Sequence, residues 1–311
     1  MARKLRLEYE GALYHVMSRG DRGQDIFLDD RDRVRFIETL GEACLKTGWQ
    51  VHAYCLLPDQ FHLVVETPQA NLVAGMKWLL GVYTGRFNRR HKSFGHLFSG
   101  RYKSLVVDGG GTGHLKTVCD YTHLNPVWAK LIGRKQKLAA YRWSSYQAYL
   151  GPARQRPKWL RMDRLLGEYR VPTDSAAGRR HFAEAMEARR ESGQAQEFKG
   201  VRRGWCLGDK AFRKELLRRM RGRRGANHSG EEGGESAEVK AERIVKEELR
   251  RRGWRKAELR KLAKGDKGKV AIAARLRRET TVTLQWVAER LAMGSWSGVA
   301  NLVAAARKKA R

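Results

Sequence analysis

The sequence lacks the features of membrane-spanning and disulfide-stabilised proteins. Its longest apolar runs, such as YCLLP and FHLVVE, are far too short to cross a bilayer, and its amino terminus lacks the continuous apolar core of a signal peptide. The four cysteines lie far apart and form no C-x-x-C pair, so neither a zinc knuckle nor a disulfide framework is indicated. We expect a soluble, cytoplasmic protein with reduced and mostly buried thiols.

Acidic residues are scarce relative to basic ones. The 311-residue chain has 33 Asp and Glu against 64 Lys and Arg, which gives a net charge of +31. Because this excess is spread along the chain, it is typical of a protein that binds a polyanion. Nucleic acid is the commonest polyanion, and a membrane surface is the weaker alternative.

The first part of the chain alternates between strand and helix patterns. Apolar alternation predicts strands at 12–20, 49–57, 60–66 and 101–108, and a helical period predicts helices at 31–48 and 71–91, with Asn71 as the cap of the second helix. The order β-α-β-β-α-β predicts an α+β fold, a ferredoxin-like antiparallel sheet with helices on one face.

The rest of the chain divides into further regions. Residues 1–151 form the first predicted domain, 152–222 a basic helical extension, 223–236 a flexible linker rich in Gly and Glu, and 237–311 a helical domain. Around Gly294 two short helices suggest a helix-turn-helix with Ser295 as cap of the second helix, and Ser295 and Asn301 as DNA contacts. A generic helical hairpin is the alternative.

Two polar residues interrupt the apolar stretch LLPDQFHLVVET. Strand alternation sends Gln60 and His62 to one face and Phe61 and Leu63 to the other, so the first two look like half of a site. The alternative is that His62 is a core histidine with a single hydrogen-bond partner, and the surrounding sequence must distinguish these two roles.

Six blocks of sequence occur in an order that resembles a known family. They are YHVMSRGDRGQDIF, VHAYCLLPDQFHLVVETP, FNRRH, GHLFSGRYKSLVVD, YTHLNPVWAKLI and YRWSSYQAYLG. Together, over roughly residues 7–151, they resemble the REP-associated tyrosine transposases, IS200-like relatives of the single-tyrosine HUH transposases.

The resemblance implies a metal site and a nucleophile. In that family a His-x-His pair on the third strand holds a divalent cation, and here Gln60 stands in the first position with His62 in the second. Tyr121 corresponds to the nucleophile and Asn125, four residues later, to a further metal ligand, with Mg²⁺ or Mn²⁺ as the cofactor. Since Pro126 follows Asn125, a helix cap is an equally weighted role for this asparagine.

The resemblance also implies a function. It implies a protein that binds single-stranded DNA hairpins of repetitive palindromic elements and cleaves and rejoins strands through a 5′-phosphotyrosine, as a metal-dependent strand transferase associated with the nucleoid. Gln60 motivates a rival, a DNA-binding protein that has lost cleavage but still recognises hairpins or duplex. A duplex-binding regulator that acts through its carboxyl-terminal helices is a third reading, and a homodimer is an open option.

Basic residues flank the aromatic residues Phe87 and Tyr102, a mixture that can follow a phosphate backbone while stacking unpaired bases. Any one of them is an ordinary surface charge, but as a group they predict a DNA track: Arg19, Arg86, Arg89, Arg90, Arg101 and Lys103.

Two further histidines lie in predicted strands. If the hairpin turns at Pro58 and Asp59, Val65 opposes His52, which places His52 on the face away from His62 in a structural role. His15 has no assigned role.

Overall fold

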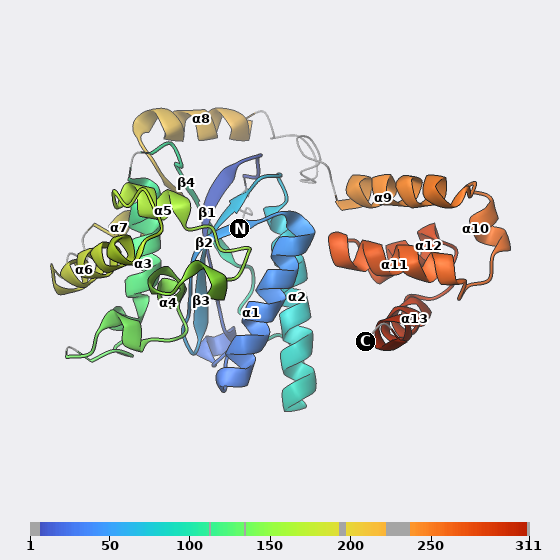
Figure 1. Cartoon of the computed structure of the whole chain (residues 1–311), viewed down its shortest axis with the longest axis horizontal. Coiled ribbons are helices and arrows are strands. Elements are labelled where there is room, and N and C mark those ends of the chain that lie inside the picture. Colours follow the sequence, from blue (N-terminus) through green and yellow to red (C-terminus); the bar gives the residue numbers. More distant parts are fainter. Residues whose placement is uncertain (1–6, 112, 134, 193–196, 222–236, 310–311) are drawn as a thin grey trace.

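The structure is a computed structural model and describes residues 7–309 apart from 112, 134, 193–196 and 222–236. Its first part contains the expected strands and helices in the expected order (Figure 1): β1 (Ala12–Arg19), α1 (Asp30–Thr47), β2 (Gln50–Leu56), β3 (Gln60–Thr67), α2 (Leu72–His91), β4 (Lys103–Val107) and α3 (His114–Trp128). The strands form a sheet in the order β2-β3-β1-β4, in which all neighbours are antiparallel. The predicted ferredoxin-like α+β fold is confirmed.

The sheet has helices on both faces (Figure 1), so the prediction of helices on one face is wrong in this respect, because α3 packs on the second face. On one face lie α1 and α2, the two helices of the predicted fold, where the ring of Phe36 is 4.8 Å from that of Phe61 in β3. On the other face lies α3, whose Tyr121 ring is 5.7 Å from that of His62. Since Phe61 and His62 are consecutive in a strand, they point to opposite faces, and each face therefore has its own packed layer.

Local contacts determine where α1 and α2 begin and end. Asp29 caps α1 by accepting a hydrogen bond from the backbone N–H of Asp32, and Gly48 ends the helix with a φ of 74°. Asn71 precedes α2, but its side chain does not cap that helix. It accepts a hydrogen bond from Trp49 Nε1 and donates one to Thr47 O, both at 2.8 Å, which ties α2 to the start of β2.

A β-bulge in β2 changes the predicted register. Val65 pairs with Val51, and Val64 pairs with Ala53, so His52 is the extra residue between them. Its Nε2 lies 3.0 Å from Oε2 of Glu66, which points to the same face as His62 because the two are four residues apart in β3. The prediction that His52 opposes Val65 and faces away from His62 is therefore wrong.

The segment after α3 covers the outer side of that helix (Figure 1). The ring of Phe182 packs 5.1 Å from Tyr149 and 4.9 Å from Tyr169, and the chain then returns to the sheet, where β5 pairs in parallel with β4. The helical elements here and in the loops are η1 (Asp21–Gly23), η2 (Leu138–Ala140), α4 (Tyr146–Leu150), η3 (Ala153–Gln155), α5 (Asp163–Glu168), α6 (Ala176–Ser192), α7 (Lys199–Arg203) and α8 (Lys210–Arg221), with β5 at Cys206–Leu207. The predicted linker, residues 223–236, lies outside the described residues.

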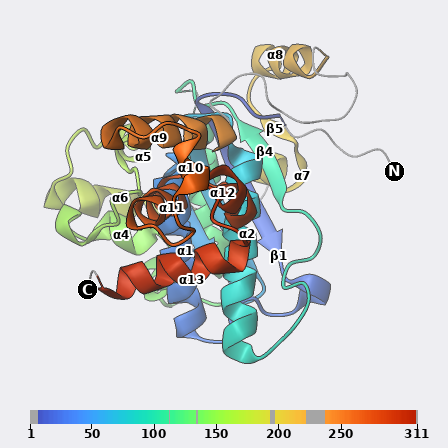
Figure 2. The ribbon, with the colours of Figure 1, turned by 90° about the vertical axis from the view of Figure 1, so that its right-hand side faces the viewer.

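The carboxyl-terminal helices have a hydrophobic core of their own. They are α9 (Ala237–Arg252), α10 (Glu258–Lys261), α11 (Lys267–Glu279), α12 (Leu284–Arg290) and α13 (Trp296–Lys309). Ile244, Ile272 and Val287 are buried between them. Figure 2 shows this bundle in front of α1 and α2, where Lys46 Nζ donates to Thr280 O at 3.2 Å and Lys240 Nζ donates to Lys46 O at 2.9 Å.

Two further properties concern the whole described chain. Among the described helices, none is long and apolar enough to cross a membrane. All four cysteines are free thiols, and three of them are buried, as predicted.

Candidate active site

Two histidines from neighbouring strands meet beneath α3. His15 Nε2 in β1 lies 3.1 Å from His62 Nδ1 in β3, and the rings are nearly parallel, with an angle of 11° between their planes. In the β1–β3 register His15 pairs with Val64, which places it diagonally opposite His62 on the same face. The imidazole partner of His62 is therefore His15, a residue to which the sequence assigned no role.

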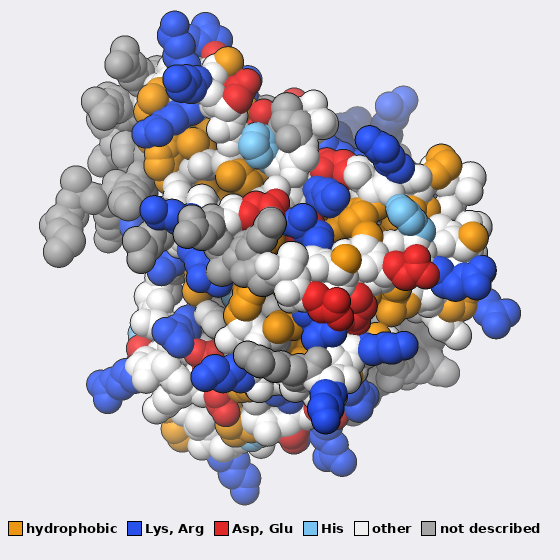
Figure 3. All heavy atoms as spheres, turned by 90° about the vertical axis from the view of Figure 1, so that its left-hand side faces the viewer, with side chains coloured by type: hydrophobic (Ala, Val, Ile, Leu, Met, Phe, Trp, Pro, Cys, Tyr) orange, Lys and Arg blue, Asp and Glu red, His pale blue; other side chains and the backbone are white. Residues whose placement is uncertain are grey.

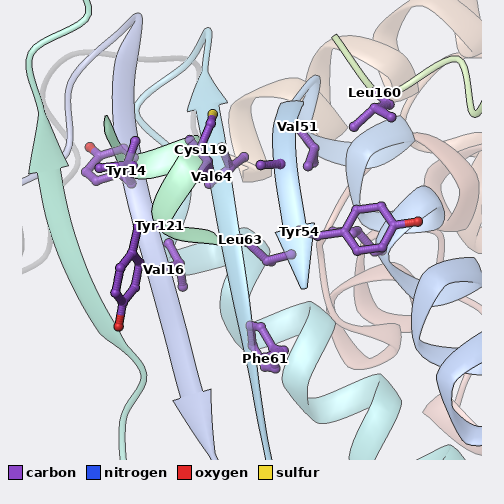
Figure 4. Close-up of a cluster of buried hydrophobic side chains, with 14 of the residues drawn as sticks. Tyr14, Val16, Val51, Tyr54, Phe61, Leu63, Val64, Cys119, Tyr121 and Leu160 are labelled. Carbon is purple, nitrogen blue, oxygen red and sulfur yellow. The ribbon is translucent and has the colours of Figure 1, made fainter. Parts of the chain in front are cut away.

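Tyr121 covers this histidine pair from α3. Its ring stands edge-on to both imidazoles, with centroids 5.5 Å from His15 and 5.7 Å from His62. Figure 4 shows Tyr121 on α3, beside β1. The side chain is buried, with 8% of the residue exposed. The structure thus brings the predicted nucleophile and one predicted metal ligand into contact.

Helix α3 continues through Pro126. Asn125 lies inside the helix, and its Nδ2 donates to the carbonyl of Tyr121 at 2.8 Å. The alternative that Asn125 caps a new helix beginning at Pro126 is therefore wrong. Because the helix persists, Tyr121, Asn125 and Trp128 lie along one face at i, i+4 and i+7, and the rings of Tyr121 and Trp128 are 5.2 Å apart.

Burial keeps the histidine pair neutral. The loss of solvation lowers the pKa of His62 to about 4, and it lowers the pKa of His15 well below its usual value, with a smaller contribution from the neighbouring His62. At neutral pH both rings are uncharged imidazoles, the form that binds a metal.

The metal site implied by the resemblance can be compared with the donors that are present. His62 Nε2 is buried, and it has no hydrogen-bond partner among the described residues. Gln60, half-buried at the start of β3, and Asn125 offer amide oxygens. The described residues contain no group of three His, Cys, Asp or Glu side chains arranged for a metal. An orphaned imidazole nitrogen with neutral oxygen donors nearby fits a weakly held divalent cation.

Basic residues lie on the same face of the sheet as the histidine pair. Met17 pairs with His62 on one side and with Lys103 on the other, so Lys103 shares their face, and Arg19 pairs with Gln60 one step further along. Lys103 and Arg101 are exposed, whereas Arg19 forms an ion pair with Asp59 at 2.8 Å. Lys103 and Arg19 of the predicted DNA track therefore lie on the face of the sheet that α3 covers.

The other basic residues of the predicted track belong to α2. Arg90 bonds to Asp29 and to the buried Asp32, and Arg86 bonds to Thr39 and Glu42, so both hold α2 to α1. Arg89 is exposed and forms no ion pair with the described residues. The aromatic residues Phe87 and Tyr102 are buried, which leaves neither ring free to stack on a base in this conformation.

Residues 8–125 match the family model described as "Transposase IS200 like". They form an IS200-like transposase domain. This domain contains His15, Gln60, His62, Tyr121 and Asn125, and the resemblance read from the sequence is confirmed for it. A solved structure described as "Structure of the REP associates tyrosine transposase bound to a REP hairpin" is 12% identical with a TM-score of 0.40, and the match covers 48% of this chain and 84% of that one. No curated protein matches the chain.

Residues outside the transposase domain complete the surroundings of Tyr121. Phe198, just before α7, packs 5.7 Å from Tyr121 and 5.1 Å from Trp128. Arg202 in α7 lies over the same two rings. Neither residue stands out in the sequence, because both reach the site through the fold of the extension.

The buried acid Asp120 lies on a different side of α3 from Tyr121. Asp120 is buried, its Oδ1 accepts a hydrogen bond from the Tyr169 hydroxyl at 2.7 Å, and Arg189 Nε lies 2.6 Å from its Oδ2. Desolvation raises the pKa of Asp120 to about 7, and the attraction of Arg189 only partly opposes it.

The carboxyl-terminal residues predicted to contact DNA lie on the surface. Ser295 accepts a hydrogen bond from the N–H of Gly298 at 3.2 Å, so the predicted cap of α13 is confirmed. Asn301 is exposed on α13, and Trp296 at the start of this helix is 59% exposed. Helices α12 and α13 are joined by a short turn with Gly294 at a φ of 85°. DNA binding by this helical pair stays a prediction.

Proposed function

We propose that this protein binds single-stranded DNA hairpins of short palindromic repeats and cleaves and rejoins them through a 5′-phosphotyrosine on Tyr121. The observation that carries the proposal is the contact of Tyr121 with the neutral His15–His62 pair inside an IS200-like transposase domain. A net charge of +31 supports a DNA substrate. Such a protein would act on chromosomal DNA in the cytoplasm.

The reaction conserves the number of phosphoester bonds. The Tyr121 oxygen bonds to phosphorus, the bond from phosphorus to the 3′ oxygen breaks, and the phenol proton leaves to solvent as the 3′ oxygen takes one up. A phenol has a pKa of about 10, so it must be held in line with the leaving oxygen to react at neutral pH. Packing of Tyr121 between the histidine pair and the rings of Trp128 and Phe198 restricts its orientation. Rejoining is the reverse reaction with a new 3′ hydroxyl.

His62, Gln60 and Asn125 are the residues that would hold a divalent cation. When bound, Mg²⁺ or Mn²⁺ would polarise the non-bridging oxygens and stabilise the leaving 3′ oxygen. His62 presents its Nε2, which no described residue bonds, while Nδ1 is oriented by His15. A hydrogen bond to the second ring nitrogen is the usual way in which a ligating imidazole is oriented.

Gln60 supports a second candidate function, a hairpin-binding protein without cleavage. An amide in place of an imidazole gives up a nitrogen donor, and even changes to residues that only support a metal ligand typically cost about 10 to 100-fold in affinity or activity. In this case DNA affinity remains and the covalent step is lost.

The covalent adduct distinguishes the two functions. The full chain would be incubated with Mn²⁺ and a labelled pool of hairpins with randomised single-stranded flanks, and the adduct would be detected after denaturation. We expect an adduct with the wild type and none with Tyr121→Phe, which keeps the ring but loses the nucleophilic oxygen. Tyr54→Phe is the matched control, because Tyr54 is equally buried, at 8% exposure, and packs against Trp159 away from the histidine pair.

Each result of the adduct and binding measurements favours or contradicts one of the two functions. An adduct that survives in Tyr121→Phe would show that another residue is the nucleophile. Binding without an adduct at any metal would favour the binding-only function. Binding should also weaken steeply with salt, because each neutralised phosphate releases counterion, and salt-insensitive binding would contradict a DNA-binding role.

A further inference from the structure

Helix α7 is anchored over the nucleophile by apolar side chains. Phe198 and Val201 are buried, and the Phe198 ring lies against Tyr121 and Trp128. The chain continues from α7 into β5, which is hydrogen-bonded to β4. The position of α7 is therefore fixed on both sides, and this part of the chain lies beyond the 8–125 match.

Arg202 is the exposed residue that α7 places at Tyr121. Its guanidinium carbon lies 6.0 Å from the centroid of the Tyr121 ring and 5.2 Å from that of Trp128. The ion pairs of the described residues do not include Arg202. Arg189 makes a useful contrast, because its guanidinium also lies over Phe198 but is paired with Asp120 and Glu197. Arg202 is thus a cation at the nucleophile that no described acid neutralises.

The chemistry at Tyr121 calls for positive charge at this place. Attack on a phosphodiester concentrates negative charge on its two non-bridging oxygens, and the donor set for a cation is short of one imidazole at Gln60. A guanidinium is always charged and offers a planar pair of N–H donors that matches two phosphate oxygens. Stacking on aromatic rings restricts its orientation, so little freedom remains to be lost when the phosphate binds.

We propose that Arg202 binds the non-bridging oxygens of the phosphate that Tyr121 attacks, and so supplies from the extension a catalytic residue that the transposase domain itself does not contain. The inference rests on the proposed function. Lys103 is another exposed cation on this side of the sheet, but it comes from the start of β4, and no ring contact between it and Tyr121 occurs among the described residues.

Figure 3 shows why Arg202 must be tested against other arginines. The face that carries α6 and α8 is covered with many Lys and Arg side chains, so a loss of general charge would weaken DNA binding wherever it occurs. Arg213 is the matched control. It lies in α8, is exposed, and packs over a different ring, that of Trp205, at 5.9 Å. Arg202→Ala and Arg213→Ala remove the same charge from the same extension.

The first measurement is the rate of adduct formation by the full chain with Mn²⁺ and the hairpin pool. We expect Arg202→Ala to slow the reaction by about 100-fold, the usual effect of removing one donor to a developing negative charge. Arg202→Lys should recover part of the rate, since it restores the charge but not the planar pair of donors. Arg213→Ala should react at the wild-type rate.

The second measurement needs neither cleavage nor metal. Affinity for one hairpin would be measured in EDTA while each phosphate of the single-stranded flank is replaced in turn by an uncharged methylphosphonate. With the wild type, one replacement should weaken binding more than its neighbours do. With Arg202→Ala, the methylphosphonate at that position should weaken binding no more than the replacements at neighbouring positions do. Arg213→Ala should keep the wild-type profile. Arg202→Ala should also reduce the slope of log affinity against log salt concentration by about 0.7, the value for one phosphate contact to a single strand.

The inference is overturned if Arg202→Ala forms the adduct at the wild-type rate or keeps the wild-type methylphosphonate profile, or if Lys103→Ala alone removes that profile. A wild type that binds hairpins but does not cleave them leaves the affinity profile to decide. A wild type that binds no hairpin at all contradicts the proposed function, and the role of Arg202 falls with it.

Discussion

His15 Nε2 and His62 Nδ1 lie 3.1 Å apart across two strands, and His62 Nε2, beneath Tyr121, has no hydrogen-bond partner in the part of the chain that the structure describes. The separation of the two residues in sequence is 47 positions. One ring nitrogen of His62 is thereby held by a neighbour while the other is available, which is the usual arrangement of a metal-binding histidine.

Replacing His15 should impair His62 without removing it. We expect His15→Gln to reduce the rate of adduct formation and the affinity for Mn²⁺ by about 10 to 100-fold, while hairpin affinity in EDTA stays unchanged. Mn²⁺ binding would be followed by electron paramagnetic resonance. His123→Gln is the control, because His123 is also buried but bonds to Ser145 on another side of α3. Equal losses in both variants would mean that His15 has only a packing role.

Restoring the missing imidazole should raise activity. Gln60 is already on the face of His62, two residues earlier in β3, so Gln60→His places a nitrogen donor where the resemblance implies one. We expect faster adduct formation, with Mn²⁺ better than Mg²⁺ because imidazole nitrogen favours the softer ion. If no metal and no hairpin yields an adduct with this variant, more than one element of the site has been lost and the binding-only function is the better one.

Asp120 should make stability depend on pH. Its pKa rises from an ordinary 3.8 to about 7 on folding, so between these values the folded protein binds more protons than the unfolded chain and stability falls as pH rises. In the wild type this effect lowers the free energy of unfolding by up to about 4 kcal/mol between about pH 4 and pH 7. Asp120→Asn does not titrate and should not show this decrease. Urea unfolding at a series of pH values would measure it, and parallel curves for the two proteins would contradict the assignment.

We expect Arg90 to contribute to stability and the neighbouring Arg89 to contribute to DNA binding. Arg90 bonds to Asp29 and to the buried Asp32 at the start of α1, and this contact lowers the pKa of the Asp29 carboxyl. Arg90→Ala should therefore lower the midpoint of thermal unfolding, since it leaves a buried carboxylate with fewer partners. The adjacent and exposed Arg89 is the control, and Arg89→Ala should change DNA affinity more than stability. The reverse pattern would return Arg90 to the DNA track.

The carboxyl-terminal helices should fold and bind DNA by themselves. Their core of Ile244, Ile272 and Val287 is internal to residues 237–309, and the bundle is joined to α1 by hydrogen bonds such as that from Lys46 Nζ to Thr280 O. A fragment from Ala237 onward is expected to unfold cooperatively and to bind duplex DNA, and Asn301→Ala should weaken that binding. If the fragment folds but does not bind DNA, the helical pair is a generic helical hairpin. If the fragment does not fold, the predicted domain boundary is wrong.

Much of the domain was predictable because its signals are local. Strand alternation and helical period located β1 to β4, α1 and α2 to within a few residues, and the two-residue period correctly put Gln60 and His62 on one face. The spacing of Tyr121 and Asn125 predicted their shared face, provided that the helix continued through Pro126, and packing on both sides of α3 keeps it continuous.

The remainder depends on contacts between distant segments. The bulge at His52 has no clear sequence signal, yet it moves that side chain to the other face of the sheet. The pairing of His15 with His62 follows from the β1–β3 register, and a trial register of the two strands could have found it. Phe198 and Arg202 reach Tyr121 only because the extension folds back over α3, which no local pattern predicts.

The short strand β5 protects an edge of the sheet. Cys206 and Leu207 pair with Val106 and Val107, so the outer side of β4 is occupied at its apolar end. An uncovered apolar edge strand is a template for pairing with another chain. A protein cut after Gly151 would expose this edge together with the outer surface of α3, and we expect it to self-associate and precipitate. The family-matched segment ends at Asn125, whereas we expect a soluble fragment to need the chain as far as the end of α8 at Arg221.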